Sequence, residues 1–353
     1  MMADGKKKSA LDIIKSYDGP PVRIMEVCGT HTHEIFRLGL RQILPKEVTL
    51  ISGPGCPVCV TPVSFIDEAI WLALERGVTI CTFGDLVRVP GSEGSLATAR
   101  SQGAKVEIVY SPVDACGYAA AHRDEQVVFL SVGFETTTPA ACLAVKAAAE
   151  QELTNFSILT ANKTMPQAYE ALKDSADVFL YPGHVEAVMG TKHCEGLAER
   201  GISGVVAGFT AKELLTAFAV ILAKFPQGKP FFKNCYPRVV TAEGSLPGQR
   251  LMAEVMEPCD SEWRGLGVIP MSGQRLQKRY AAYDARQKYG VPPMHGRSNP
   301  ACRCGDVLQG LCTPPQCPVF GKGCTPDHPV GACMVSHEGA CSAYYQYGGG
   351  NHE

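Results

Sequence analysis

Residues 127–152, VVFLSVGFETTTPAACLAVKAAAEQE, contain the pattern that decides the fold. A short apolar run at 127–132 is followed by a Gly-Phe turn, three threonines and, from Pro139, an alanine-rich stretch. A buried strand, a turn and a helix in this order form the repeating unit of α/β proteins with parallel sheets. We therefore predict a strand at 127–132 and a helix at 139–152.

The same alternation extends over the first 225 residues. Helical patterns occur at 62–76 and 211–224, and further apolar runs predict strands at 22–27, 48–52, 78–82, 106–110, 157–160, 178–181 and 204–207. This order predicts an α/β fold with parallel sheets flanked by helices. A polar break at 120–126 favours two lobes over one large sheet, and we place them at residues 1–123 and 124–225.

The remaining segment, residues 226–353, has a different character. Proline and glycine become more frequent, apolar periodicity fades, and 7 of the 16 cysteines of the chain lie from residue 302 onward. Segments with little apolar core often depend on a bound metal. We predict a small third domain that holds a metal centre.

Charge and hydropathy exclude several functions. The formal net charge is −2, and the only basic run is Lys6-Lys7-Lys8, so we expect no nucleic-acid partner. No apolar stretch has the length of a signal peptide or a membrane span, which indicates a cytoplasmic protein without a membrane partner. Because the cytosol keeps thiols reduced, the C-terminal cysteines indicate metal or redox chemistry, whereas Cys81, Cys116 and Cys142 suit a buried apolar role.

Unusual residues follow four of the predicted strands. The turns are CGTHTH at 28–33, GPGCPVC at 53–59, GFETTTP at 133–139 and YPGH at 181–184. Ligands of open parallel sheets bind beyond the carboxyl ends of the strands. We expect these turns to converge on one site.

Cys56 and Cys59 have the spacing of a metal-chelating pair or of a redox disulfide, and both alternatives stay open. The helix that follows is expected to lower the pKa of these thiols. Cys28 adds a third soft ligand, and of the nearby His31 and His33 we expect only one to approach the site. A capping or core role is an equal alternative for either histidine.

Glu135 is a carboxylate at a strand end. If Thr138 caps a helix that begins at Pro139, the presence of the threonine and the proline is explained. The presence of a carboxylate at position 135 is not. A role of Glu135 in proton transfer or in supporting a metal ligand is the hypothesis. His184 is a weaker candidate, because histidines in turns are often merely exposed.

The C-terminal cysteines suit an iron–sulfur cluster. A [4Fe–4S] cluster is held by four thiolates, and Cys302, Cys317, Cys324 and Cys341 offer one such set, although spacing alone does not choose among the C-terminal cysteines. Zinc sites more often contain tight CxxC pairs, which this segment lacks. Three alternatives stay open for the other cysteines: Cys304 in place of Cys302, and thiol exchange by Cys312 or Cys333.

In their order, the four turns resemble the signature motifs of the HypD family of hydrogenase maturation factors. The C-terminal stretches CRCG at 302–305, GACMVS at 331–336 and GAC at 339–341 extend the resemblance over residues 22–347. It implies a scaffold that assembles the Fe(CN)2CO group of [NiFe] hydrogenases. The implied partners are a HypC-like chaperone, a HypE-like cyanide donor and, indirectly, the hydrogenase large subunit.

The resemblance also implies roles for individual residues. Cys28, Cys56 and Cys59 would bind the iron and perform thiol chemistry, with His31 and Glu135 as further catalytic candidates. The resemblance implies that Cys302, Cys317, Cys324 and Cys341 bind the [4Fe–4S] cofactor, and that the activity of the chain itself is redox chemistry during cyanation. The alternatives are an Fe–S-dependent thiol–disulfide reductase that assembles no iron, and a zinc-containing interaction module.

Overall fold

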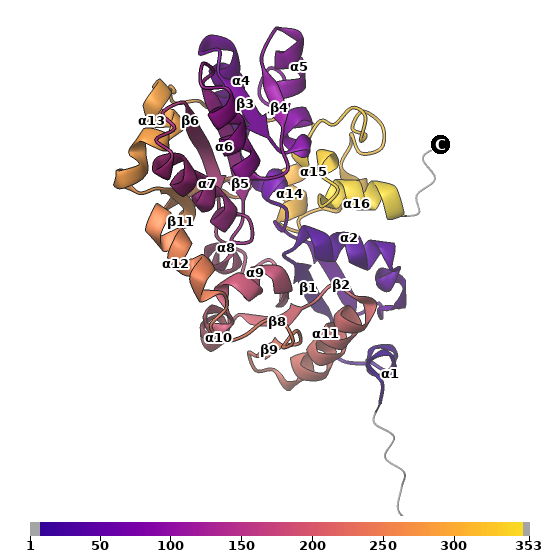
Figure 1. The fold of residues 1–353 in the computed structure, drawn as a ribbon. Coiled ribbons are helices and arrows are strands. Elements are labelled where there is room, and N and C mark those ends of the chain that lie inside the picture. Colours follow the sequence, from indigo (N-terminus) through magenta and orange to yellow (C-terminus); the bar gives the residue numbers. More distant parts are fainter. Residues whose placement is uncertain (1–7, 349–353) are drawn as a thin grey trace, which may run out of the picture.

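The computed structural model describes residues 8–348 and shows two α/β lobes, each built on a parallel sheet (Figure 1). Sheet A has the strand order β2-β1-β7-β8-β9, and sheet B has the order β4-β3-β5-β6. A third sheet is an antiparallel hairpin of β10 and β11 with a β-bulge between Cys259 and Ser261. Lys6 and Lys7 of the basic run lie outside the described residues.

The strands are β1 (Val22–Glu26), β2 (Val48–Ser52), β3 (Thr79–Thr82), β4 (Val106–Ile108), β5 (Val127–Gly133), β6 (Phe156–Asn162), β7 (Val178–Pro182), β8 (Ser203–Ala207), β9 (Phe232–Asn234), β10 (Met256–Trp263) and β11 (Gly267–Leu276). The α-helices are α1 (Ala10–Lys15), α2 (Gly29–Arg37), α3 (Pro57–Val60), α4 (Val63–Glu75), α5 (Leu96–Ser101), α6 (Pro112–Ala121), α7 (Thr138–Glu150), α8 (Met165–Ala171), α9 (Gly183–Met189), α10 (Lys192–Glu199), α11 (Ala211–Lys224), α12 (Leu246–Val255), α13 (Ala285–Tyr289), α14 (Cys304–Leu308), α15 (Ala332–Val335) and α16 (Ala340–Tyr347). Short 3-10 helices are η1 (Leu40–Ile43), η2 (Gly84–Arg88), η3 (Phe225–Gln227), η4 (Lys278–Tyr283) and η5 (Pro314–Gln316).

Strand β5 shows why its sequence is apolar throughout. Val128 and Leu130 pack into a core with α4, whereas Val127 and Phe129 pack into a second core with α6 and α7. Since successive side chains of a strand point to opposite faces, a sheet covered by helices on both faces needs apolar residues at every position. The predicted α/β class with parallel sheets flanked by helices is confirmed.

All eight predicted strands and the three predicted helices form, with ends shifted by at most two residues. The sheets, however, do not follow the boundaries expected at residues 123 and 225. Sheet A joins β1 and β2 to β7, β8 and β9, while sheet B is formed by the chain between them. Apolar periodicity identifies strands but not their neighbours in space, so this division of the sheets was not visible in the sequence.

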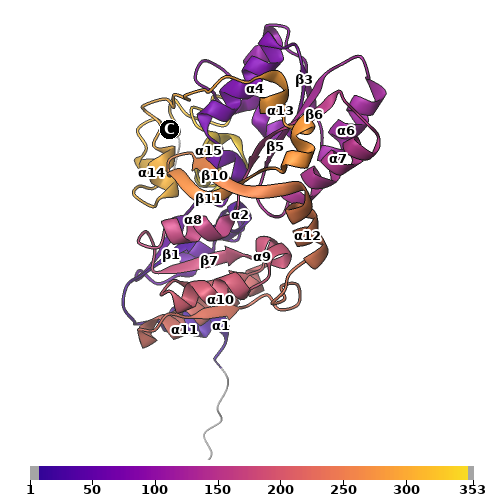
Figure 2. The same ribbon diagram turned by 90° about the vertical axis from the view of Figure 1, so that its left-hand side faces the viewer.

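The segment after residue 226 packs on both lobes. Trp263 and Leu308 belong to a core that contains Met25 of β1, whereas Ala285 and Val335 belong to the core beside β5. The β10–β11 hairpin crosses between the lobes (Figure 2), and α16 lies beside α2 (Figure 1). The cysteine-rich part therefore lies against the strand ends where the sequence places the site.

Among the residues that the structure describes, none of the helices has both the length and the apolar character required to cross a membrane.

Candidate thiol and metal site

Cys28 and the GPGCPVC turn are in direct contact. Cys28 follows β1 and is the N-cap residue of α2, and the amide of Gly29 donates to the carbonyl of Gly55 at 3.0 Å. A Cβ at Gly55 would lie 2.1 Å from the amide nitrogen of Cys28. Glycine is therefore required at position 55, and the backbone of this turn packs directly against the backbone of Cys28.

Cys56 is the N-cap residue of the short helix α3, and its Sγ accepts a hydrogen bond from the amide of Cys59 at 3.3 Å. Both side chains are buried. Burial raises the pKa of the Cys59 thiol well above its usual value, and burial likewise raises the pKa of Cys28 to about 12. The expectation that the helix would lower the thiol pKa is wrong for Cys59, because desolvation of the charged form outweighs the helix end.

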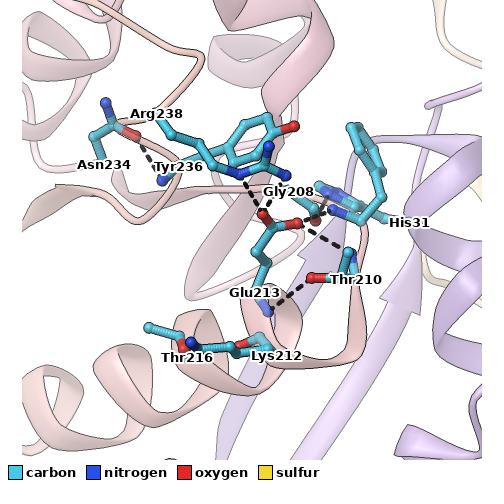
Figure 3. Close-up of polar contacts among 10 residues, drawn as sticks. His31, Gly208, Thr210, Lys212, Glu213, Thr216, Asn234, Tyr236 and Arg238 are labelled. Carbon is cyan, nitrogen blue, oxygen red and sulfur yellow. Dashed lines mark hydrogen bonds and ion pairs between the residues drawn. The ribbon is translucent and has the colours of Figure 1, made fainter.

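The three histidines near this turn have different surroundings. His31 is fully buried, its Nε2 donates to the carbonyl of Gly208 at 3.0 Å, and burial lowers its pKa to about 3 (Figure 3). His33 lies on another side of α2, with Nε2 3.4 Å from the Tyr347 hydroxyl. It is His184, ranked lower from the sequence, whose Nδ1 lies 4.0 Å from the Cys28 Sγ.

The loop after β8 is held in place by Glu213. Its carboxylate accepts hydrogen bonds from the amides of Phe209 and Thr210 at 3.0 and 3.1 Å and from Arg238 Nη2 at 2.7 Å (Figure 3). Phe209 also contacts the rings of His31 and His184, with centroids 4.8 and 5.1 Å away. This network holds the loop against which both imidazoles pack, and of the two only His184 approaches the Cys28 thiol.

Six cysteines line one cavity: Cys302, Cys304, Cys317, Cys324, Cys333 and Cys341. All four cysteines assigned to a cluster are among them, whereas Cys312 lines a separate pocket with Tyr344. The amide of Val330 donates to Cys324 Sγ at 3.3 Å, as amides do to cluster ligands. The donor set suits an iron–sulfur cluster, although the cavity has a volume of only about 10 Å³, so the loops must separate around four irons.

The two groups of thiols form one continuous series. Cys59 is within hydrogen-bonding reach of Cys333, which in turn reaches Cys304 and Cys341. Cys304 also reaches Cys302. The sequence predicts two separate sites for the CxxC pair and the C-terminal cysteines. Only the fold shows that the two groups are in contact, through helices α3 and α15.

Two carboxylates not considered from the sequence support the Cys28 turn. Glu26 is fully buried and accepts from Arg41 Nη2 and from the Thr32 hydroxyl, both at 2.7 Å, which ties β1 to α2. Glu338 accepts from the Thr30 hydroxyl at 2.8 Å. The C-terminal segment thus closes over the first turn of α2.

Glu135 lies in a different group of residues. Its Oε1 accepts from the amide of Met165 at 2.9 Å, burial raises its pKa to about 7, and the charged side chains that act on it are Glu186 and His193.

Thr138 is not the cap of α7: the helix begins at Thr138, whose hydroxyl donates to the carbonyl of Phe134 at 2.8 Å.

The fold and the site define a class: a two-lobed α/β protein in which a buried thiol site adjoins a six-cysteine cavity. A sequence model described as "Hydrogenase formation hypA family" (HypD) matches residues 6–348. The chain belongs to the HypD family.

Curated relatives agree along nearly the whole length. Hydrogenase maturation factor HypD of Rhizobium leguminosarum bv. viciae is 45% identical over 337 residues, which cover 92% of this chain and 88% of the relative. The factor of the same name from Rhodobacter capsulatus is 45% identical over 339 residues, covering 93% and 90%. That of Escherichia coli (strain K12) is 44% identical over 337 residues, covering 93% and 89%.

Proposed function

We propose that this chain is a cytoplasmic scaffold on which iron acquires the ligands of the Fe(CN)2CO group before transfer to a hydrogenase large subunit. The observation that supports the proposal best is the buried contact between the Cys28 turn and the Cys56–Cys59 turn. Iron with cyanide and carbonyl ligands is soft and low-spin, and thiolates suit it better than carboxylates do. Burial also keeps water away from the iron substrate.

Cys28, Cys56 and Cys59 are the proposed iron ligands. Because burial raises the pKa of Cys28 and Cys59, iron has to displace their protons, so binding releases protons to solvent. His184 lies against Cys28 and limits the space on that side. His31 positions the turn through its bond to the carbonyl of Gly208.

The C-terminal cysteines are proposed to hold a [4Fe–4S] cluster, with Cys302, Cys317, Cys324 and Cys341 as ligands. When bound, the cluster supplies single electrons. Cys304 and Cys333, which line the same cavity, are then free for thiol exchange.

The thiol series supports an exchange reaction between two cysteine pairs. Attack by the Cys333 thiolate on Cys59 of a Cys56–Cys59 disulfide releases the Cys56 thiolate, and attack by Cys304 on Cys333 then releases Cys59. The Cys304–Cys333 dithiol thus becomes a disulfide, and two electrons have moved to the CxxC pair. Two protons restore both released thiols.

Cys28, Cys56 and Cys59 fill the three positions that three diatomic ligands leave on a six-coordinate iron only while all three bind, and thiol exchange at the Cys56–Cys59 pair withdraws two of them. We expect a HypC-like chaperone to supply a further thiolate and a HypE-like protein to deliver cyanide. A ligand on a separate protein would also allow the finished group to leave.

The thiol series also favours a second candidate, a thiol–disulfide reductase that uses the same cysteines but assembles no iron. The two candidates differ in one spectroscopic property, because only iron with cyanide and carbonyl ligands absorbs in the infrared region of these ligands.

Anaerobic co-purification with a HypC-like protein, followed by infrared spectroscopy, tests the proposal. Cyanide and carbonyl bands are expected in the wild-type complex and in Cys235→Ala, a control at a half-buried cysteine outside the site, but not in Cys28→Ala. Undiminished bands in Cys28→Ala would remove the role of Cys28. Absence of the bands from every complex, with intact disulfide reduction, would favour the reductase.

A further inference from the structure

A group of three metal-ligand side chains lies apart from the cysteine series. Glu186 comes from α9, and His193 and Cys194 come from α10. The carboxylate and the thiol are fully buried, and one ligand atom of each of the three residues lies within 4.8 Å of the others. Neither the family motifs nor the proposed iron chemistry uses these residues.

The distances suit one small metal ion. Glu186 Oε2 lies 3.0 Å from His193 Nε2, which lies 3.3 Å from Cys194 Sγ. Ligand atoms around a tetrahedral zinc ion with bonds of 2.0–2.3 Å are separated by about 3.3–3.7 Å. Movements of a few tenths of an ångström would complete this geometry. Imidazole, thiolate and carboxylate are all ligands that zinc accepts.

The backbone prepares His193 for this role. Its ring is hydrogen-bonded to the carbonyl of Gly190. Because Nε2 faces Glu186 and Cys194, the nitrogen left for the carbonyl is Nδ1. A proton on Nδ1 leaves the lone pair of Nε2 directed at the other two ligands, which is the arrangement found in most metal-bound histidines.

The charge of Glu186 is paired with His193, and only when that imidazole is protonated. Glu186 Oε2 has no hydrogen-bond partner of acceptable geometry, and Glu135 Oε2, at the end of β5, has none either. Within residues 8–348, neither carboxylate pairs with a lysine or an arginine. Two buried carboxylates in mutual repulsion are costly unless a cation or protons neutralise them.

We propose that Glu186, His193 and Cys194 bind a divalent transition-metal ion of the zinc type, with Glu135, which lies outside this group of three, as the acceptor for a metal-bound water. Glu135 follows a strand of sheet B, whereas the other three residues belong to helices that pack on sheet A. The ion therefore connects the two lobes. This site is independent of the iron scaffold and would persist if that proposal failed.

The test uses the full chain, purified anaerobically with its cluster, and compares Cys194→Ser and His193→Gln with the control Cys235→Ser. Zinc and labile sulfide are measured per chain, and cobalt is added as an optical probe of thiolate ligation. We expect about one zinc per chain in the wild type and the control, and affinity for cobalt weakened by more than about 10-fold in the two ligand variants. Labile sulfide should be unchanged.

X-ray absorption at the zinc edge of the wild type gives a readout that does not depend on the folding of a variant. One sulfur at about 2.3 Å with nitrogen and oxygen neighbours supports the site. A zinc ion with four sulfur neighbours, no zinc at all, or cobalt binding that is equal in all variants would overturn it.

Discussion

Replacing Gly55 with alanine is expected to separate the two turns of the thiol site. The added Cβ would lie 2.1, 2.3 and 2.5 Å from the amide nitrogen, Cα and carbonyl carbon of Cys28. Ordinary contact begins at 3.4 Å, so one of the two backbones must move by more than 1 Å. No flexible side chain is available to absorb this movement.

The expected cost follows from overpacking, which destabilises proteins by about 1–3 kcal/mol. Gly117, inside helix α6, is the matched control because a Cβ there meets nothing within 4 Å. Gly117→Ala should stabilise the chain by about 0.5–1 kcal/mol through helix propensity. The same chemical change should therefore have opposite signs at the two positions.

Urea unfolding measures the stability of each variant. If the transition is not two-state, the unfolding of each lobe is followed separately. Infrared spectroscopy of the anaerobic complex measures iron assembly. Gly55→Ala should have a lower midpoint and lose the cyanide and carbonyl bands, while Gly117→Ala keeps both. A Gly55→Ala protein with wild-type midpoint and full bands would refute the close approach of the two turns.

Three further predictions concern the cysteine series and a buried lysine. Anaerobic wild-type protein should contain about four irons and four labile sulfides per chain, and Cys324→Ala should bleach the brown colour. Cys333→Ser should keep the colour but block dithionite-driven reduction of a Cys56–Cys59 disulfide, measured by alkylation and mass spectrometry. Burial lowers the pKa of Lys163 to about 7. Between pH 7 and 10.5, this residue therefore binds fewer protons in the folded chain than in the unfolded chain. Its contribution to stability therefore rises with pH in that window, and Lys163→Met should remove this rise in urea unfolding.

Each of these predictions has a control or a contrary outcome. Cys312→Ala should stay brown, since Cys312 does not line the six-cysteine cavity. Stoichiometric zinc without labile sulfide would exclude the cluster, and rapid disulfide reduction in Cys333→Ser would exclude exchange through that thiol. For Lys163, an unchanged stability difference between variant and wild type at pH 7 and pH 9.5 would show that the ammonium is not desolvated.

Local patterns predicted the elements of this fold well because burial on both faces leaves a continuous apolar run, as in β5. They could not show that β1 pairs with β7, since strand pairing depends on contacts between distant parts of the chain. The hairpin β10–β11 was missed because one of its faces is largely exposed, which interrupts the apolar pattern.

The site was predicted in part for the same reason. Cys28, Cys56 and Cys59 stand in turns at strand ends, a position that the sequence reveals. The sequence could not place His184 beside Cys28, because only the fold shows that β7 lies beside β1 and brings this turn to Cys28. The pKa of Cys59 depends on burial by the C-terminal segment. The spacing of residues near Cys59 in the sequence cannot predict this burial.

The order of strands in sheet A has a consequence for synthesis on the ribosome. All strands of sheet B are complete once Asn162 has been made, whereas β1 can pair with β2 early but must wait for β7 on its other edge, and β7 must wait for β8. One edge of β1 therefore stays unpaired until sheet B has been made, and such distant pairing slows folding. Because Glu338 can contact Thr30 only after all the strands have been made, a chain that lacks this segment leaves the Cys28 turn uncovered.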